Sequence, residues 1–432
     1  MRLPVRGVAL DVQLRDVRRV VGVAAFAALV ACAMAPPRVA APLPSSATEA
    51  QRYLGDAVAR RRMLEAELVN PTNGYSRLRL AHYATGKSED WDALPEYNPK
   101  AAPWATPLGA LAPLAITPAA RAGDPEALRA LGEAAFDRYP VQIATAAERV
   151  VTDEASARRF GFWVDGGRIG GLVRVQTPDG VPHLAYACAT CHTGVRRGKL
   201  VTGAPCETLD IGALSVAAFR GGAPAFLAWG PGRIDVTTPG GTEPVRIPDL
   251  RAVRDLSFLH HTASVAQRGV TSLAIRVETL VIVSNSRTIR PPREIALGLA
   301  LYLWSLEDRI PHRDSLSPEE KHGEVLFTAH CASCHAPPSY TGKPVPITEV
   351  GTDGHLGGSA ERGTGAYRVP TLRGIADRGP LLHDASIATT GELLDPARLE
   401  PGWRGGPVLG HRYGLGLTPG ERADLEAFVE TL

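Results

Sequence analysis

Two pentapeptides in this chain place two cysteines and a histidine at the same fixed spacing. Residues 188–192 read Cys-Ala-Thr-Cys-His, and residues 331–335 read Cys-Ala-Ser-Cys-His. Two thiols three positions apart can form thioether bonds to the two vinyl groups of a haem, and the adjacent imidazole can bind its iron. The pattern predicts two covalently bound haem c groups, with His192 and His335 as the proximal iron ligands. The attachment residues are then Cys188, Cys191, Cys331 and Cys334.

Two Cys-x-x-Cys pairs could instead form a zinc site or a redox dithiol. A zinc site does not require histidine directly after each pair, and a thioredoxin-like dithiol belongs to a βαβ pattern in a reducing compartment. The repetition of the whole pentapeptide favours haem. The chain has six cysteines, so Cys32 and Cys206 are left over and no disulfide framework can be built. Cys206 has no neighbouring base that would generate a thiolate, so we expect a small buried residue.

The sixth ligand of each iron sets both its reduction potential and its access to small molecules. All three methionines precede both pentapeptides, at Met1, Met34 and Met63, so neither haem domain supplies a methionine of its own. Among the histidines, His411 stands out because Gly410 and Gly414 bracket its loop, and glycine lets backbone approach a macrocycle closely. The histidines considered as sixth ligands are His183, His260, His261, His355, His383 and His411.

The segments around the pentapeptides recur in the same order, which indicates an internal duplication. Residues 246–264 align without gaps with residues 368–386, and each copy holds a Pro-x-Leu-Arg loop followed by histidine. A Gly-Glu helix precedes each haem motif, at 132–136 and 323–327, and an apolar helix closes each unit. The closing helices are expected over Glu294–Leu306 and Glu421–Leu432. The predicted fold class is mainly α, with two tandem cytochrome c-like haem domains and extensive loop.

The first copy differs from the second by an insertion. Three residues separate Phe327 from Cys331, whereas 51 lie between Phe136 and Cys188. Residues 171–186 in this insertion contain two alternating apolar runs around Pro-Asp-Gly, which predicts a β-hairpin against the first haem. The two haem pockets should therefore differ.

The N-terminus has the features of an export signal. Arg18 and Arg19 precede twelve apolar residues, too few to span a bilayer but right for a secretory signal. The run ends Leu-Val-Ala-Cys at Cys32, as in the lipobox of bacterial lipoproteins, so we expect a signal peptide over 1–31 and lipidation of Cys32. Because Ala33 follows instead of Asp, outer-membrane attachment on the periplasmic side is favoured. Without the lipid, the protein would be periplasmic or secreted.

The remaining chain divides into four predicted parts. Residues 32–47 form an Ala/Pro-rich tether, and residues 48–123 form an N-terminal helix, Glu49 to Leu68, followed by an irregular Pro-rich segment. The first haem domain spans 124–312, beginning with a helix that Asp124 caps, and the second spans 316–432.

The charge balance excludes one class of partner. The 47 basic and 45 acidic side chains give a net charge of +2, without a basic block of the kind that tracks nucleic acid. Redox partner proteins are expected but not identified, and membrane contact is expected through the N-terminal lipid alone.

From about Leu131 to its end, the chain resembles the dihaem c-type cytochromes related to bacterial cytochrome c peroxidases. Residues 369–373 (Val-Pro-Thr-Leu-Arg) and 383–386 (His-Asp-Ala-Ser) carry this resemblance. Four further motifs are similar to the branch that includes the dihaem rubber oxygenases: residues 191–194, 203–205, 229–235 and 410–414. In that branch the histidine of the Gly-His loop is the distal ligand of the second haem. The resemblance therefore implies this role for His411, with His383 and Tyr413 as alternatives.

The resemblance does not transfer an activity. Peroxidases of the family carry a methionine ligand soon after the His-Asp-Gly-Ser loop, where this chain has Ala397, Arg398 and Leu399. Rubber oxygenases are much longer than this chain, so the resemblance does not assign their substrate to this protein either. For the first haem, His261 aligns with His383 and lies beside His260. If either reaches the iron the haem is closed, and if neither does its face is open to an oxidant.

The leading hypothesis is a lipid-anchored dihaem cytochrome c that transfers electrons outside the inner membrane. The alternative is an oxidoreductase that reduces peroxide or activates dioxygen at the first haem, with the second haem as electron relay. A third hypothesis is a haem protein that senses a diatomic ligand at the first haem. Whether the protein is an enzyme stays open at the level of sequence.

Overall fold

The computed structural model describes residues 47–83, 114–176, 182–219, 224–235, 243–285, 290–306, 310 and 315–432, all within the compact unit Pro44–Leu432. The predicted signal peptide, Cys32 and the tether up to residue 46 lie outside the described residues. Of the helices in the described ranges, none is both long and apolar enough for a membrane crossing.

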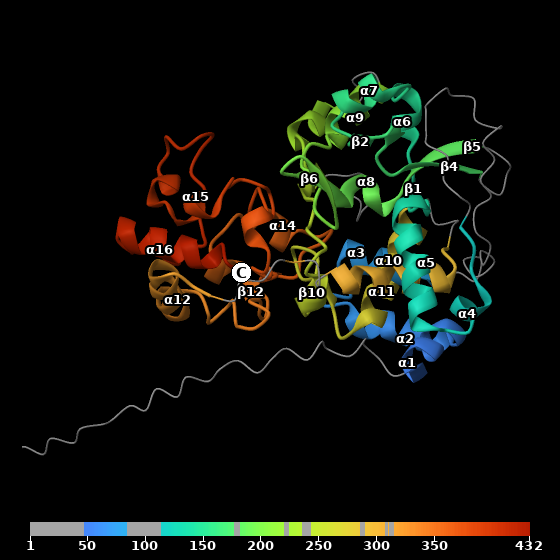
Figure 1. Cartoon of the computed structure of the whole chain (residues 1–432), viewed down its shortest axis with the longest axis horizontal. Helices are drawn as coiled ribbons and strands as arrows, with labels where there is room; N and C mark the ends of the chain where they lie inside the picture. Colours follow the sequence, from blue (N-terminus) through green and yellow to red (C-terminus); the bar gives the residue numbers. More distant parts are fainter. Residues whose placement is uncertain are drawn as a thin grey trace, which may run out of the picture. The chain divides into compact units, whose positions relative to one another are not determined.

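The described residues are mainly helical, with short sheets between the helices (Figure 1). The α-helices are α1 (Ala47–Gly55), α2 (Ala57–Glu67), α3 (Gly74–Tyr83), α4 (Pro118–Arg121), α5 (Pro125–Arg138), α6 (Thr145–Val150), α7 (Glu154–Arg159), α8 (Cys188–His192), α9 (Ile211–Ala218), α10 (Val270–Ser284), α11 (Arg293–Ser305), α12 (Pro318–His330), α13 (Ile347–Val350), α14 (His355–Gly358), α15 (Thr390–Leu394) and α16 (Pro419–Val429). The strands are β1 (Gln142–Ile143), β2 (Val164–Asp165), β3 (Arg168–Ile169), β4 (Leu172–Gln176), β5 (Pro182–Tyr186), β6 (Thr193–Arg196), β7 (Lys199–Thr202), β8 (Arg233–Ile234), β9 (Val245–Arg246), β10 (Phe258–Leu259), β11 (Val265–Ala266), β12 (Val345–Pro346) and β13 (Ala366–Tyr367).

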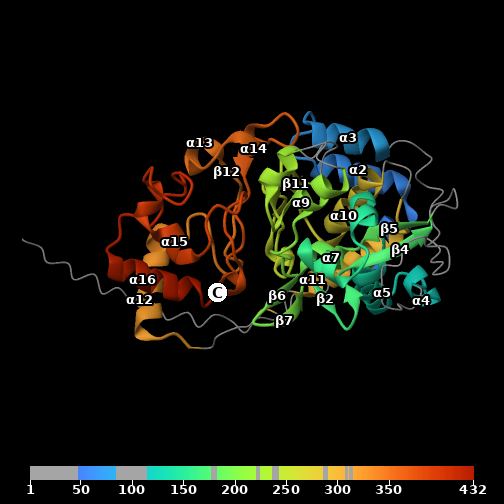
Figure 2. The ribbon, with the colours of Figure 1, turned by 90° about the horizontal axis from the view of Figure 1, so that it is seen from above.

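Two helix pairs, each crossing at a glycine, anchor two separate hydrophobic cores (Figures 1 and 2). In the first core α5 packs on α11, and a Cβ on Gly132 would lie 1.9 Å from the carbonyl oxygen of Gly298. In the second core α12 packs on α16, and a Cβ on Gly323 would lie 2.0 Å from the carbonyl oxygen of Asp424. Glycine is required at both crossings because the two backbones touch there. The Gly-Glu helices predicted from the sequence are thus the first helices of these pairs.

The aligned segments 246–264 and 368–386 share several backbone features, although Ala252 has a φ of −113° and the corresponding Gly374 has a φ of 73°. The left-handed residues His260 and Ala263 in the first segment correspond to Leu382 and Ala385, each 122 positions later. The 3-10 turns 253–255 and 375–377 and the antiparallel bridges Leu259–Val265 and Leu381–Ile387 correspond at the same spacing.

The two segments also bind each other reciprocally. The amide of Arg246 donates to the carbonyl of His383, and the amide of Arg368 donates to the carbonyl of His261, both at 2.8 Å. Arg246 and Arg368 are corresponding residues, and so are His261 and His383. The reciprocal pair of hydrogen bonds places the two Pro-Leu-Arg loops side by side.

The predicted hairpin is confirmed. Strands β4 and β5 pair antiparallel with Val173 opposite Ala185, and β1 extends the sheet on the other side of β5. Val173 and Ala185 are buried in a small cluster of their own, and Tyr186 at the end of β5 lines the first cavity described below. The insertion therefore supplies part of the wall of this cavity.

Two expectations for the N-terminal region are wrong. The single helix predicted over Glu49–Leu68 is two helices, because Asp56 has extended backbone and its side chain accepts a hydrogen bond from Ala59 N–H, which starts α2. The segment predicted to be irregular contains α3 and α4, while residues 84–113 lie outside the described part. The apolar pattern of helix α3 is interrupted because its buried face includes Arg79, which covers the ring of Tyr75. Hydrophobic periodicity in the sequence therefore does not indicate this helix.

Candidate haem-binding sites

The first pentapeptide forms the short helix α8, and its cysteines and histidine line one cavity. The Nδ1 atom of His192 lies 3.1 Å from the carbonyl oxygen of Pro248, which belongs to the first Pro-Leu-Arg loop. A hydrogen bond from Nδ1 to a carbonyl fixes the ring and leaves Nε2 free for a metal. Burial is the main cause that lowers the pKa of His192 to about 4, so the ring is neutral and able to ligate at neutral pH.

The second pentapeptide follows α12 and lines a second cavity of equal volume. The Nδ1 atom of His335 lies 3.1 Å from the carbonyl oxygen of Tyr340. Burial lowers the pKa of His335, opposed by hydrogen bonding to the backbone of Tyr340 and Pro370. Pro370, which corresponds to Pro248, also lines this cavity, so the same proline of the repeated loop lies in the cavity of each pentapeptide histidine.

Corresponding residues of the two loops also form corresponding walls. Each cavity is enclosed mainly by aliphatic side chains, as a porphyrin ring requires. The pairs that occupy the same position in the two cavities are Ile247 and Val369, Leu250 and Leu372, Val253 and Ile375, and Leu259 and Leu381.

The cysteines fit thioether attachment better than zinc binding. Burial raises the pKa of the Cys188 thiol to about 12 and that of the Cys331 thiol to about 11, and it raises the pKa of Cys191 as well. A zinc site needs thiolates, which an apolar wall disfavours, whereas thioethers are neutral. In the part of the chain that the structure describes, no three His, Cys, Asp or Glu side chains cluster as a metal site. Cys206 is buried, as expected.

In the second cavity, His411 lies opposite His335. The two ring centres are 6.5 Å apart and the ring planes are inclined at 65°. Imidazole nitrogens bind metal ions at about 2 Å, so two imidazoles on opposite sides of one ion have ring centres about 6 Å apart. Burial is the main cause that lowers the pKa of His411 to about 4, which keeps the ring neutral.

A buried arginine holds the His411 loop in place. Gly410 has a φ of 80°, and a Cβ there would lie 2.1 Å from the amide nitrogen of Thr352, so only glycine fits. Arg398 is fully buried and donates from Nη2 to the carbonyl oxygens of Gly410 and His411, at 2.9 and 2.8 Å. From the sequence, position 398 was notable only because it lacks the methionine of the peroxidases. The role of Arg398 in holding the His411 loop was not predicted.

The two alternatives to His411 also line the second cavity but have other partners. His383 stacks on Tyr367 with ring centres 4.6 Å apart, and its Nε2 lies 3.5 Å from a carboxylate oxygen of Asp353. The Tyr413 ring contacts that of His411 at 5.4 Å.

The first cavity has no corresponding pair of imidazoles. His260 accepts a hydrogen bond at Nε2 from Arg276, and His261 has its Nε2 3.0 Å from the carbonyl oxygen of Arg246. Burial lowers the pKa of both histidines, so both are neutral. Across the described residues, no aromatic or imidazole ring contacts His192. The remaining candidates, His183 and His355, line neither cavity.

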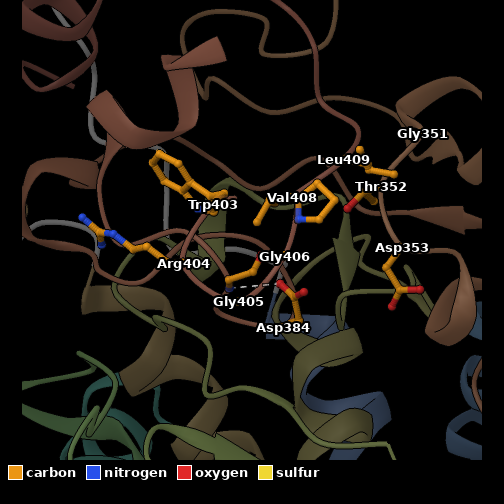
Figure 3. Close-up of a pocket in the computed structure, with 12 residues that line it drawn as sticks. Gly351, Thr352, Asp353, Asp384, Trp403, Arg404, Gly405, Gly406, Val408 and Leu409 are labelled. Atoms are coloured by element: carbon orange, nitrogen blue, oxygen red, sulfur yellow. Dashed lines mark hydrogen bonds between the residues drawn. The ribbon is translucent and has the colours of Figure 1, made fainter. Parts of the chain in front are cut away.

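A third, more open cavity lies beside the His411 loop (Figure 3). It shares Thr352 with the second haem cavity and carries the carboxylates of Asp353 and Asp384, with Trp403 on its far side. No motif in the sequence pointed to this cavity, because its lining comes from three separate loops.

Comparisons with known proteins agree with the second site. Residues 320–432 match the cytochrome c family. This part of the chain is a c-type cytochrome domain, a class that binds its haem covalently. A search of curated proteins found no match. Among solved structures, the chain is similar to Kuenenia stuttgartiensis hydrazine synthase (19% identity, 46% of this chain, 76% of that chain, TM-score 0.33). It is also similar to a MauG-like protein associated with microbial copper homeostasis (18% identity, 47% and 78% covered, TM-score 0.34).

Proposed function

We propose that the chain is a dihaem c-type oxidoreductase in which the haem at Cys188 and Cys191 is the reacting site. The haem at Cys331 and Cys334 then relays electrons to it. The observation that carries this proposal is the difference between the cavities: the His411 ring lies 6.5 Å from that of His335, and no ring of the described residues contacts His192. The geometry thus favours the alternative hypothesis from the sequence over plain electron transfer.

Several observations support two haems and an internal duplication. Both pentapeptides line cavities of equal volume, and the histidine of each is hydrogen-bonded to a backbone carbonyl, that of Pro248 for His192 and that of Tyr340 for His335. The loops agree in backbone conformation at the left-handed pairs His260 and Leu382, and Ala263 and Ala385. If the chain bound only one haem, the first cavity, which contains two thiols and a neutral histidine, would have no ligand that uses these groups.

The second site has the features of a relay. His335 and His411 would hold iron on both sides, which blocks small ligands. Arg398 and Gly410 fix the His411 loop, so little rearrangement accompanies electron transfer. His383 and Tyr413 would then be wall residues and not ligands.

The first site has the features of a reacting centre. Haem with one free axial face supplies a redox-active iron that binds peroxide or dioxygen. The protein residues contribute orientation of His192 by Pro248, exclusion of water by the aliphatic walls, and polar groups on the cavity lining. The Nε2 atoms of His260 and His261 are engaged by Arg276 and by the carbonyl of Arg246, which disfavours ligation through Nε2, whereas the buried Nδ1 atom of His260 makes no hydrogen bond.

The family branch and the location are part of the proposal. The motifs at 229–235 and 410–414 place the chain nearest to the branch that includes the dihaem rubber oxygenases, without their substrate. The signal over 1–31 and Cys32 support export and lipid anchoring, with the catalytic part in the periplasm.

The test is the spin state of the purified, air-oxidised protein. Mass spectrometry should first show two added haems. We expect one low-spin and one high-spin haem, with one equivalent of cyanide bound and a carbon monoxide shift after reduction. His411→Ala should make the second haem high-spin, whereas His261→Ala and His383→Ala should leave the spin states unchanged.

Two outcomes would contradict the proposal. If both haems are low-spin and carbon monoxide causes no shift, the protein only transfers electrons. If one haem is high-spin but neither peroxide nor dioxygen is consumed in the presence of a reductant, the protein is a sensor of diatomic ligands.

A further inference from the structure

The two haem cavities meet at one arginine. Arg368 lines both cavities, as does His261, whose carbonyl accepts the hydrogen bond from the Arg368 amide at 2.8 Å. Arg246, which corresponds to Arg368 in the first copy, lines only the second cavity. Arg246 and Arg368 therefore correspond in sequence but differ in the cavities that they line.

The Arg368 side chain has no anionic partner in the described structure. Its Nε atom is buried and makes no hydrogen bond, and no carboxylate of the described residues forms an ion pair with it. Burial is the main cause that lowers its pKa to about 10, and the neighbouring charges that add to this effect are those of Arg246 and Arg378. A buried guanidinium surrounded by like charges is costly unless an anion joins it.

Other buried arginines around the cavities are neutralised within the protein. Arg362 lies 3.3 Å from a carboxylate oxygen of Glu243, and Arg378 lies 3.4 Å from one of Asp249. Arg246 resembles Arg368: its Nε is buried without a hydrogen bond, and its side chain donates to the carbonyl of Pro380 but pairs with no carboxylate of the described residues. Arg276, which lines the first cavity, also pairs with no carboxylate of the described residues, but its Nε donates to His260. Arg246 and Arg368, which begin the repeated loops, differ from Arg276 because their Nε atoms are buried without a hydrogen bond.

We propose that Arg368 binds haem propionates in both cavities, that Arg246 binds a propionate in the second cavity alone, and that Arg368 thereby couples the two haems electrostatically. The inference rests on the proposed function, since it needs both haems. Each haem brings two propionates, which are the anions that the cavities lack. A guanidinium presents five N–H donors in a planar fork, enough to serve two carboxylates at once.

The proposal has a measurable consequence for the reduction potentials. A reduced haem carries one positive charge less than an oxidised haem, so a nearby buried cation favours reduction. Removal of the Arg368 charge should lower both midpoint potentials, and removal of the Arg246 charge should lower only the second. By the same sign, reduction of one haem removes a positive charge and should lower the affinity of the other haem for its electron.

Spectroelectrochemical titration of the full-length dihaem protein tests this. The two haems are distinguished by their high-spin and low-spin bands. We expect Arg368→Gln to lower both potentials by about 59 mV or more, which is a tenfold change in a one-electron equilibrium. Arg246→Gln should change only the low-spin haem, and Arg368→Lys should restore most of both potentials because it keeps the charge.

The outcomes separate this inference from the proposed function. Two bound haems with potentials that are unchanged in Arg368→Gln, or changed at one haem only, would overturn the coupling role of Arg368. Equal shifts in Arg368→Gln and Arg368→Lys would show that packing and not charge is responsible. A protein with a single haem, or with two low-spin haems, would instead refute the proposed function.

Discussion

Replacement of Arg398 should release His411 from the second haem without any change to the histidine itself. The Arg398 guanidinium is fully buried and binds carbonyl oxygens on both sides of the loop, those of Leu393, Val408, Gly410 and His411. Methionine fills similar volume but donates no hydrogen bond. In this variant the loop keeps Gly410 and its contact with Thr352 but loses the hydrogen bonds from the Arg398 guanidinium.

The magnitude follows from the hydrogen bonds to the loop. A hydrogen bond that involves a charged group contributes about 1.5 to 3 kcal/mol. The two bonds to the carbonyls of Gly410 and His411 therefore sum to about 3 to 6 kcal/mol, and hydration of these carbonyls in the open loop recovers part of this. We expect a net loss of about 3 kcal/mol, which lowers the ratio of closed to open loop about 100-fold.

The assay is the low-spin fraction of the oxidised protein with and without added imidazole. Arg398→Met should give a high-spin fraction at the second haem that imidazole abolishes, and Arg398→Lys should do so less. Arg404→Met is the matched control, since exposed Arg404 pairs with Glu392 and lies over the ring of Trp403 but makes no hydrogen bond to the His411 loop among the described residues. If Arg398→Met keeps a fully low-spin second haem, either His411 is not the ligand or the arginine does not hold it.

Two further predictions concern stability. Gly323→Ala should destabilise the second core by about 1 to 3 kcal/mol, because its Cβ would lie 2.0 Å from the Asp424 carbonyl, whereas Gly420→Ala meets no atom within 4 Å and should be neutral in thermal unfolding. Buried Glu67 has its pKa raised to about 7, mainly by burial, so the folded state holds its proton more tightly than the unfolded chain. This contribution to stability is complete below the unfolded pKa and is lost as the pH rises through about 7, amounting to about 3 kcal/mol. Glu67→Gln should therefore reduce the fall in melting temperature between pH 5 and pH 8, and an unchanged fall would contradict the role of this carboxyl.

The haem motifs could be predicted because their chemistry is local. Attachment depends on the spacing of cysteines and histidine within five residues. The repeated loops can be aligned without gaps. Both patterns can therefore be recognised without knowledge of the tertiary structure. The helix starts at Asp124 and the hairpin over 171–186 could be predicted for the same reason. The placement of His411 in the second cavity could be anticipated from its flanking glycines and the resemblance to a family, and its role as an iron ligand stays a prediction.

The roles of Arg398 and Arg368 could not be predicted because they depend on contacts between distant segments. Arg398 lies within the 3-10 turn Pro396–Leu399 and binds a loop twelve residues further along. The helix α3 was missed because its buried arginine breaks the apolar pattern. One signal was present in the sequence: arginine begins both repeated loops, at positions 246 and 368.

The segment that matches the cytochrome c family does not contain its whole haem cavity. Arg246 and His261 of the first copy line the second cavity, and Leu356, Arg362 and Arg368 of the second copy line the first. Most of these exchanged residues are polar or charged, whereas the walls that each copy supplies to itself are mainly aliphatic. If both cavities hold haem as proposed, the groups that tune the irons are thus shared at the boundary, while the groups that only enclose the rings are not. Neither reduction potential would then be a property of one copy, and the effect of a substitution at the boundary should be measured at both haems.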